Sequence, residues 1–530
     1  MVDLLRRWPW LAAWIAATTY SALPRRVKPL RRSGAPRAGR PLPRGDGVIY
    51  DWPTSARRAL PERGRRPHMS HDLVIRSGTV VTATDRFVAD LGIRAGRIVE
   101  IGESLPRASQ EIDATGLLVM PGGVDVHTHL DVDVGAAHTA DDFESGTAAA
   151  ACGGITTICD YAWQRRGQTL AGAIETWEAK ARGKAHIDYG FHVILSEVND
   201  AHLAEIPSIV AAGYPSFKVF MINEFSIGDH AFLRLLDAAR VAGAIVNVHA
   251  ENGDMIDHVA HEMIAAGRRD PRHYAESRPA LAEAEATQRA ITYAQLTDAE
   301  IYIVHLSCRD ALEAVRAARK RGLRVWAETR PIYLALTAER YQAGGTEAAK
   351  VVGAPPLRSA ADQVALWDGL RNGDIQAIGS DNTSWTVEQK AAGAADFTKV
   401  PYGVPGLETE MQVIYSEGVV KGRISIHTFV GAFATNPARI FGLYPKKGTI
   451  AVGSDADLVL FDPVRTRVID ERRLHSRAGY DPFHGLEVRG VPVLTLSRGE
   501  IVARDGELLS RPGRGHHLKR RRAPAVATSA

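Results

Sequence analysis

Between residues 117 and 380 the sequence alternates short apolar runs with longer stretches of helical spacing. The eight candidate strands are Leu117–Val126, Ile155–Tyr161, Tyr189–Ile194, Ser216–Phe220, Ile245–His249, Ile301–His305, Leu323–Thr329 and Ile375–Ser380. Runs without polar alternation are typical of parallel strands buried on both faces, and the stretches between them carry the apolar spacing of helices. The pattern predicts a (β/α)8 barrel of the TIM type, with its active site at the C-terminal ends of the strands.

Shorter apolar segments flank this region on both sides. They are Leu73–Ile75, Thr79–Thr82, Leu91–Ile93 and Ile98–Ile101 before it, and Leu458–Phe461, Val491–Leu496 and Ile501–Val502 after it. Because turns rather than helices separate them, they predict a small β-sandwich formed from both ends of the chain. We expect the sandwich to comprise 69–120 and 446–505, the barrel 121–445, and a C-terminal tail 506–530.

Residues 1–68 differ in charge from the rest of the chain. They hold 15 Lys and Arg against 4 Asp and Glu, whereas the whole chain has a net charge of only +4. The remainder is therefore acidic, and no nucleic-acid partner is expected. The extension has three interpretations: a signal peptide around Arg6 and Arg7, a disordered basic tail, or a start codon placed ahead of the true start at Met69. We favour the last, because the strand pattern begins directly after Met69.

The remaining composition, with 45% hydrophobic and 24% charged residues, is that of an ordinary globular protein. No apolar stretch reaches the roughly 20 residues that a membrane helix needs, so no membrane partner is expected. The three cysteines, Cys152, Cys159 and Cys308, form no CxxC pair. So few cysteines favour a reducing, cytoplasmic location over a disulfide-dependent secreted fold.

Candidate metal ligands stand at the ends of the predicted barrel strands. His127 and His129 are two residues apart, so on a strand they face the same side. His249 and His305 end the fifth and sixth runs, and Asp381 follows the eighth. Each also has a structural interpretation, as a hydrogen-bonded histidine or a helix N-cap. Imidazole and carboxylate bind zinc-type cations, and these five positions together predict a metal site.

Lys218 ends the fourth run between bulky apolar neighbours. Burial of an ammonium group is costly unless the group is paired or neutralised. Reaction of the amine with carbon dioxide would give a carboxylate that can bridge two cations. An ion pair between Lys218 and an aspartate is the alternative.

The order of these residues matches the amidohydrolase superfamily, and the surrounding segments narrow the match. The chain resembles the dihydropyrimidinase/hydantoinase family in PGGVDVHTHLD (121–131), DDFESGTAAAACGGITT (141–157), SFKVFM (216–221), HAENGD (249–254), ETRPIYL (328–334), GAPPLR (353–358), PGLETEM (405–411) and NPARIFGLYPKKGTIAVGSDADLVLFDP (436–463). The resemblance covers essentially all of 69–510, with the motifs in family order.

The resemblance implies a hydrolase that opens the C–N bond of a cyclic amide, either a dihydropyrimidine or a 5-substituted hydantoin. It implies two divalent cations, with zinc expected, and an N6-carboxylated lysine between them. The resemblance implies that His127, His129 and Asp381 bind one cation and that His249 and His305 bind the other. Lys218 would bridge the two cations. A hydroxide bridging the cations would attack the ring carbonyl, and Asp381 would be the catalytic residue that takes its proton and returns it to the leaving nitrogen. A homo-oligomer, dimer or tetramer, is also implied, because 480–522 resembles the segment through which relatives assemble.

Three candidate substrate-binding residues depart from the family pattern. Asn223 stands where a tyrosine usually stabilises the oxyanion, Ala354 replaces a serine, and Tyr402 replaces an asparagine. Ala354 and Tyr402 are expected to contact substrate through backbone groups. Asn223 has a shorter reach than tyrosine, and the loss of one oxyanion donor typically costs about 10²–10³ in rate.

Other departures surround the expected metal site. Asn382 replaces a histidine after the metal aspartate, and Arg330 stands where cysteine is common. Trp163, Phe225 and Trp385 are candidates for an aromatic substrate pocket, with ordinary packing as the alternative. Because Asn223 replaces the usual tyrosine, a hydrolase of another cyclic ureide or lactam, such as allantoin or dihydroorotate, is a second hypothesis. A non-catalytic scaffold relative is a third, which the complete set of ligands disfavours.

Overall fold

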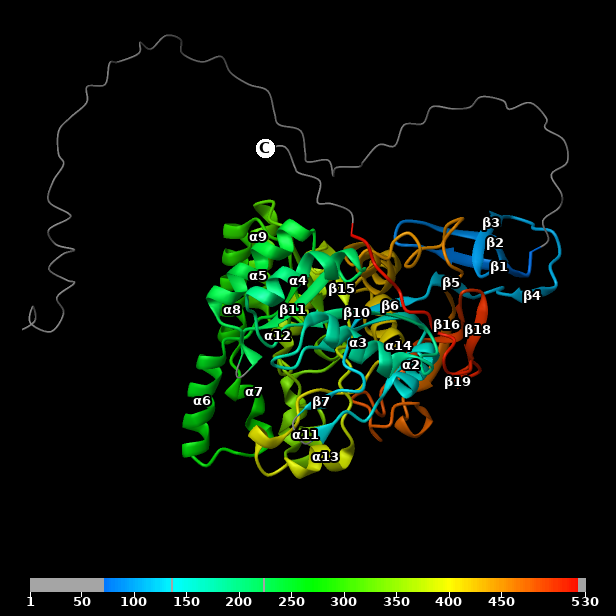
Figure 1. Cartoon of the computed structure of the whole chain (residues 1–530). Coiled ribbons are helices and arrows are strands. Elements are labelled where there is room, and N and C mark those ends of the chain that lie inside the picture. The colour runs from blue at the N-terminus through cyan, green and yellow to red at the C-terminus, as the bar shows by residue number, and fades with distance from the viewer. Residues whose placement is uncertain (1–70, 135–136, 223–224, 523–530) are drawn as a thin grey trace, which may run out of the picture. The chain divides into compact units, whose positions relative to one another are not determined.

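The computed structural model of this chain describes residues 71–134, 137–222 and 225–522. The interpretations of 1–68 and the role expected of Asn223 therefore fall outside the described residues. Figure 1 shows a barrel, and beside it a sheet in which the blue N-terminal strands lie next to the orange and red C-terminal ones.

Eight parallel strands form the barrel and follow one another in sequence order. They are β6 (Gly123–Thr128), β9 (Ile155–Trp163), β10 (Asp188–Ile194), β11 (Ser216–Phe220), β12 (Ile245–His249), β13 (Ile301–Ile303), β14 (Val325–Thr329) and β15 (Ala377–Ile378). The backbone N–H of His129 donates to the carbonyl of Asn382 at 2.9 Å, which joins the first strand to the segment after the last. The predicted (β/α)8 barrel is confirmed.

Helices connect successive strands and cover the barrel (Figure 1). They are α2 (Phe143–Cys152), α3 (Leu170–Ala181), α4 (Asp200–Ala211), α5 (Asp229–Ala242), α6 (Gly253–Ala265), α7 (Tyr274–Ser277), α8 (Ala280–Thr297), α9 (Arg309–Lys320), α10 (Pro331–Ala335), α11 (Gly345–Lys350), α12 (Ala360–Asn372), α13 (Val387–Ala392), α14 (Glu410–Ile414), α15 (Ile426–Val430) and α16 (Asn436–Ile440). Local sequence fixes several ends: Ser359 and Asp362 form a capping box on α12, and Gly243 ends α5 with a left-handed φ of 72°. None of the described helices has the length and hydropathy needed to cross a membrane.

The first predicted strand, Leu117–Val126, is two strands in the structure. β5 (Leu118–Pro121) belongs to the mixed sheet, and the barrel begins with β6 after Gly122. A Cβ at Gly122 would lie 2.3 Å from the Thr156 side chain, so the chain passes between the two sheets where only glycine fits. Both strands are fully buried, and for that reason hydropathy does not reveal the break.

The mixed sheet joins the two ends of the described chain. Its strands are β1 (Leu73–Val81), β2 (Arg86–Arg94), β3 (Arg97–Gly102), β4 (Gln110–Asp113), β5, β16 (Leu458–Val468), β17 (Glu487–Ser497), β18 (Glu500–Arg504) and β19 (Glu507–Leu508). β5 pairs with β1 in parallel and with β16 antiparallel, so it links the two halves. The segments expected as two strands at 73–75 and 79–82 are one strand with a bulge near Ser77, whose φ is 55°. The domain boundaries stay predictions.

The C-terminal segment runs along the N-terminal ends of the barrel strands. The backbone N–H of Leu518 donates to the carbonyl of Tyr189 at 2.7 Å. Arg520 is fully buried there and donates to the carbonyl of Phe191 and to Ser216 Oγ. This end of the barrel is therefore closed, which leaves the opposite end for a site.

Candidate functional site

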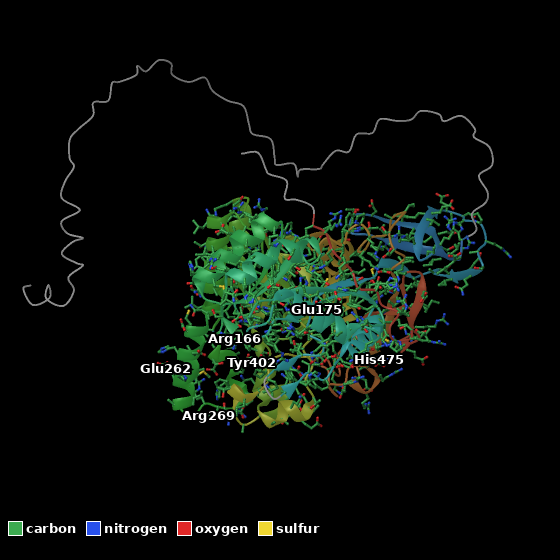
Figure 2. All side chains as sticks on the ribbon, in the orientation of Figure 1. Arg166, Glu175, Glu262, Arg269, Tyr402 and His475 are labelled. Atoms are coloured by element: carbon green, nitrogen blue, oxygen red, sulfur yellow. The ribbon has the colours of Figure 1, made fainter. Side chains whose placement is uncertain are left out.

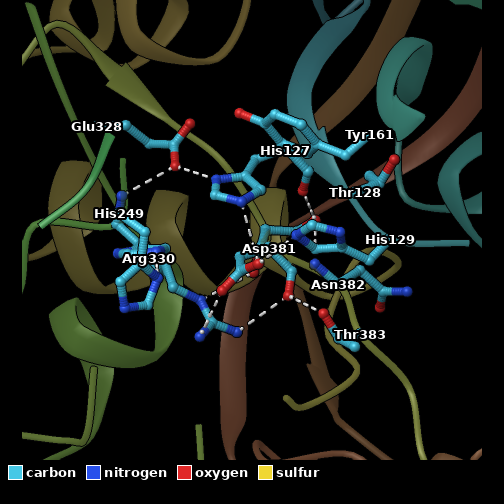
Figure 3. Close-up of polar contacts among 12 residues, drawn as sticks. His127, Thr128, His129, Tyr161, His249, Glu328, Arg330, Asp381, Asn382 and Thr383 are labelled. Carbon is cyan, nitrogen blue, oxygen red and sulfur yellow. Dashed lines mark hydrogen bonds and ion pairs between the residues drawn. The ribbon is translucent and has the colours of Figure 1, made fainter. Parts of the chain in front are cut away.

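Three predicted ligands meet where the first and last barrel strands adjoin (Figure 3). His127 lies within β6 and His129 just after it, and Asp381 follows β15 with a left-handed φ of 48°. Asp381 Oδ1 lies 3.1 Å from His127 Nε2 and 3.3 Å from His129 Nε2. All three residues are buried, and their ligand atoms are close enough to share one cation.

The other predicted ligands form a second group beside the first. His305 Nε2 lies 2.9 Å from His249 Nδ1, and Lys218 Nζ lies 3.2 Å from His127 Nε2. Lys218 therefore stands next to the first group, and its amine lies over the ring of Tyr161. Both groups open into one cavity of about 460 Å³. The structure brings together all six residues that were predicted to bind metal.

Two carboxylates behind the histidines set the direction of their rings. Glu328 Oε1 lies 2.5 Å from His127 Nδ1, and Glu251 Oε2 lies 2.7 Å from His249 Nε2. Arg278 holds Glu251 in turn, with distances of 3.1 and 2.6 Å to its two oxygens. An ionised carboxylate can only accept, so each histidine donates from that nitrogen, and its other nitrogen faces the neighbouring predicted ligands. This arrangement is common for histidines that bind metal.

Burial keeps three of these histidines in their neutral form. It lowers the pKa of His129 to about 4, and it also lowers the pKa values of His249 and His305. Burial lowers the pKa of Lys218 to about 8, although the nearby carboxylate of Asp381 acts in the opposite direction. Neutral imidazole is the form that binds cations. The nitrogen and oxygen donors of the two groups are of the kind that the two divalent cations implied by the family resemblance require. At His127 burial and Lys218 are outweighed by Glu328 and Asp381, which raise its pKa, so a bound cation would replace a proton there.

Arg330 stands where the family commonly has cysteine, and the structure shows what this arginine contacts. Its buried guanidinium lies 3.0 Å from Asp381 Oδ2, on the opposite side from the histidines, and its Nε donates to the carbonyl of Ser380 at 3.1 Å. Although burial opposes the charge, Arg330 and His127 hold the pKa of Asp381 well below its usual range. Asn382, the other departure, accepts from the backbone N–H of Gly406 at 3.2 Å and holds the loop.

Aromatic side chains line the side of the cavity next to β9 and β11. The Trp163 ring centroid lies 5.8 Å from that of Phe220 and 5.3 Å from that of Phe225. All three side chains line the cavity, and so does Trp385, which is buried. Trp163, Phe225 and Trp385 thus lie where the aromatic pocket was expected, and Phe220 adds to it.

The two described substrate-binding candidates also line the cavity. Ala354 follows α11 in the chain, and Tyr402 follows α13. Figure 2 labels Tyr402 at the end of the barrel where Figure 1 shows β7 (Asp133–Val134). Its ring lies beneath the guanidinium of Arg278, 5.1 Å away, and its carbonyl accepts from the indole of Trp385 at 2.7 Å. That carbonyl is therefore engaged within the protein.

Sequence reasoning missed Glu328, Glu251 and Arg278. Glu328 is a carboxylate within the otherwise apolar or small run of β14, and such an acid in a buried strand could have been noticed. Glu251 stands two residues after His249, a spacing that can bring both side chains to one side. Arg278 carries no comparable signal, because its pairing with Glu251 joins distant parts of the chain.

Comparisons with known proteins agree with this geometry. Residues 118–502 match the model described as the amidohydrolase family. A D-hydantoinase of Geobacillus stearothermophilus is 48% identical over 458 residues, which cover 86% of this chain and 97% of the relative. A D-hydantoinase of Ralstonia pickettii is 44% identical over 454 residues, covering 85% and 99%. The crystal structure of dihydropyrimidinase from Brevibacillus agri NCHU1002 superposes with a TM-score of 0.82 at 45% identity, covering 84% and 98%. This chain therefore belongs to the amidohydrolase family, within its dihydropyrimidinase and hydantoinase members.

Proposed function

We propose that this protein hydrolyses a C–N bond of a cyclic amide, a dihydropyrimidine or a 5-substituted hydantoin. The observation that carries the proposal is the meeting of two groups of buried metal-type ligands in one cavity with an aromatic wall. A ring placed there would have its amide beside the ligands and its substituent against Trp163, Phe220 and Phe225. The relatives named D-hydantoinase support this substrate class and the D configuration.

The proposed cation ligands are the six residues predicted from the strand ends. His127, His129 and Asp381 would hold one cation, and His249 and His305 the other, with N6-carboxylated Lys218 between them. Two bound divalent cations, proposed to be zinc, would supply a nucleophilic hydroxide near neutral pH and polarise the amide carbonyl.

The chain's own residues orient the site and move the proton. Glu328 and Glu251 fix His127 and His249, so the other ring nitrogens face Asp381 and His305 without rearrangement. Asp381 would accept a proton from the nucleophile and return it to the ring nitrogen that leaves. Arg330 restrains the Asp381 side chain through Oδ2.

The remaining parts of the proposal concern substrate contacts, assembly and location. We propose that Ala354 and Tyr402 contact the ring through backbone groups; the Tyr402 carbonyl, which accepts from Trp385, has a second lone pair for such a contact. Asn223 stays a candidate oxyanion donor. A homo-oligomer and a cytoplasmic location also stay proposals, the latter consistent with three buried free cysteines.

The test is turnover by the purified full chain with its bound metal measured in the same preparation. Substrates are dihydrouracil, hydantoin, 5-phenylhydantoin, allantoin and dihydroorotate. We expect ring opening of the first three, about two metal ions per chain, and loss of both metal and activity in Lys218→Ala. A matched variant at an exposed lysine, Lys320→Ala, should keep both. Two bound metals with turnover of allantoin or dihydroorotate alone would overturn the substrate class. A metal-free native protein without turnover would favour the scaffold hypothesis.

A further inference from the structure

Lys390 is a fully buried lysine outside the proposed metal site. It lies in α13, which begins with a capping box between Thr386 and Gln389. Its side chain has no solvent exposure, and Nζ donates to the carbonyls of Val352 and Pro401, each at 2.8 Å. No carboxylate in the described parts of the chain pairs with it. An amine in such a place is costly, so its two carbonyl contacts are its main compensation.

The two carbonyls belong to separate segments that together form one wall of the cavity. Val352 lies two residues before Ala354, and Pro401 directly precedes Tyr402. The segments also touch directly, since the N–H of Gly403 donates to the Val352 carbonyl at 3.1 Å. Lys390 thus lies behind the wall and ties its two halves together.

The same wall presses against the end of the last barrel strand. Gly403 has a φ of 120°, and a Cβ there would lie 2.4 Å from the Thr383 side chain. Thr383 stands two residues after Asp381, and both line the cavity. The backbone at Gly403 is therefore in close contact with the segment that carries the proposed proton acceptor, and a shift of the wall changes the space beside it.

We infer that Lys390 is a positioning residue that sets the distance between this wall and the reacting groups. The inference rests on the proposed function, because the wall carries the two segments proposed to contact the ring. Its two contacts are unequal: without Lys390 the Val352 carbonyl keeps the Gly403 N–H, whereas the Pro401 carbonyl loses its described side-chain donor. The half at 401–403 is therefore the one that loosens, although the Gly403 N–H still ties it to Val352 and the Trp385 indole still donates to the Tyr402 carbonyl.

The test is Lys390→Met in the full chain, which keeps the length of the side chain and removes its donors. A misplacement of about 1 Å can cost about 100-fold in rate. We expect KM for hydantoin and 5-phenylhydantoin to rise about 10-fold, a smaller loss in kcat, and unchanged metal content. Hydrogen exchange should accelerate at the amides of 402–404 but not in the barrel strands. Lys320→Met, at an exposed position on α9, should leave all of these unchanged.

The outcomes separate this inference from the proposed function. A wild-type protein that opens none of the rings refutes the proposed function, whereas hydrogen exchange still reports on the wall. A Lys390→Met protein with wild-type KM and wild-type exchange at 402–404 overturns the inference. A loss of kcat and metal together, with KM unchanged, overturns it as well. If Lys390→Met does not accumulate, Lys390→Gln keeps a shorter donor, and the same rise in KM and exchange is expected.

Discussion

Replacement of Arg330 by methionine tests whether the Arg330 guanidinium is what stabilises the buried carboxylate of Asp381. The charges lie 3.0 Å apart, and both side chains are at least 89% buried. At an effective dielectric constant of about 20, their attraction is about 5 kcal/mol. Removal of one partner of a buried pair typically costs about 3–5 kcal/mol, and here Asp381 would lose its main counter-charge while it keeps the contacts with His127 and His129. We therefore expect metal-free Arg330→Met to lose about 3–5 kcal/mol of unfolding free energy.

Bound cations should reduce this loss. If Asp381 binds a cation, the cation replaces Arg330 as its counter-charge, and the remaining cost is that of the lost hydrogen bonds, about 1–3 kcal/mol. Metal should therefore stabilise Arg330→Met more than it stabilises the wild type.

Urea unfolding of metal-free and zinc-loaded protein measures both values. The control is Arg465→Met. In the wild type, Arg465 Nη1 lies 2.6 Å from Asp505 Oδ1 in an exposed ion pair, which should contribute at most about 1 kcal/mol to the unfolding free energy. A loss below about 1 kcal/mol in metal-free Arg330→Met, or an equal loss with and without zinc, would refute the reasoning.

Three further predictions concern metal affinity, pH and metal removal. Glu328→Gln should weaken zinc binding about 10- to 100-fold in a competition titration, because the amide holds His127 less firmly; an unchanged affinity would contradict this. Burial raises the pKa of Asp481 to about 7. The unfolded chain therefore releases this proton at a lower pH than the folded chain does. As the pH rises from about 4 to about 7, the unfolding free energy of the wild type should fall by up to about 4 kcal/mol relative to that of Asp481→Asn. A constant difference between them across that range would refute this assignment. Chelation should abolish turnover and lower Tm, and zinc should restore both; activity that survives complete chelation would exclude a metal-dependent reaction.

The barrel and the ligand set were predictable because the fold brings strand ends together. His127 and Asp381 are more than 250 residues apart, yet each follows an apolar run, and that is sufficient to place both at one end of a parallel barrel. Lys218 was recognisable for the same reason. The resemblance to known relatives then supplied the pairing of residues with cations, which spacing alone does not give.

What could not be predicted depends on contacts between distant segments. The break at Gly122 lies between two strands that are equally buried, so hydropathy is the same on both sides. Lys390 lies in a short polar helix and looks like an exposed residue, whereas the structure buries it against two loops. The effect of Arg330 depends on how the Asp381 side chain divides its two oxygens between Arg330 and His127, which the sequence does not determine.

The pairing of β5 with β16 has a consequence for how the protein is made. Residues 118–121 of β5 bind their second neighbour, 458–461, only after about 340 further residues have been synthesised. At about 5–20 residues per second, this takes roughly 20–70 s on the ribosome. During that time one edge of β5 has unpaired backbone groups, which is the kind of edge that recruits strands from other chains. The N-terminal strands therefore depend on late sequence for protection against aggregation, and shortened translation products should be far less soluble than the complete chain.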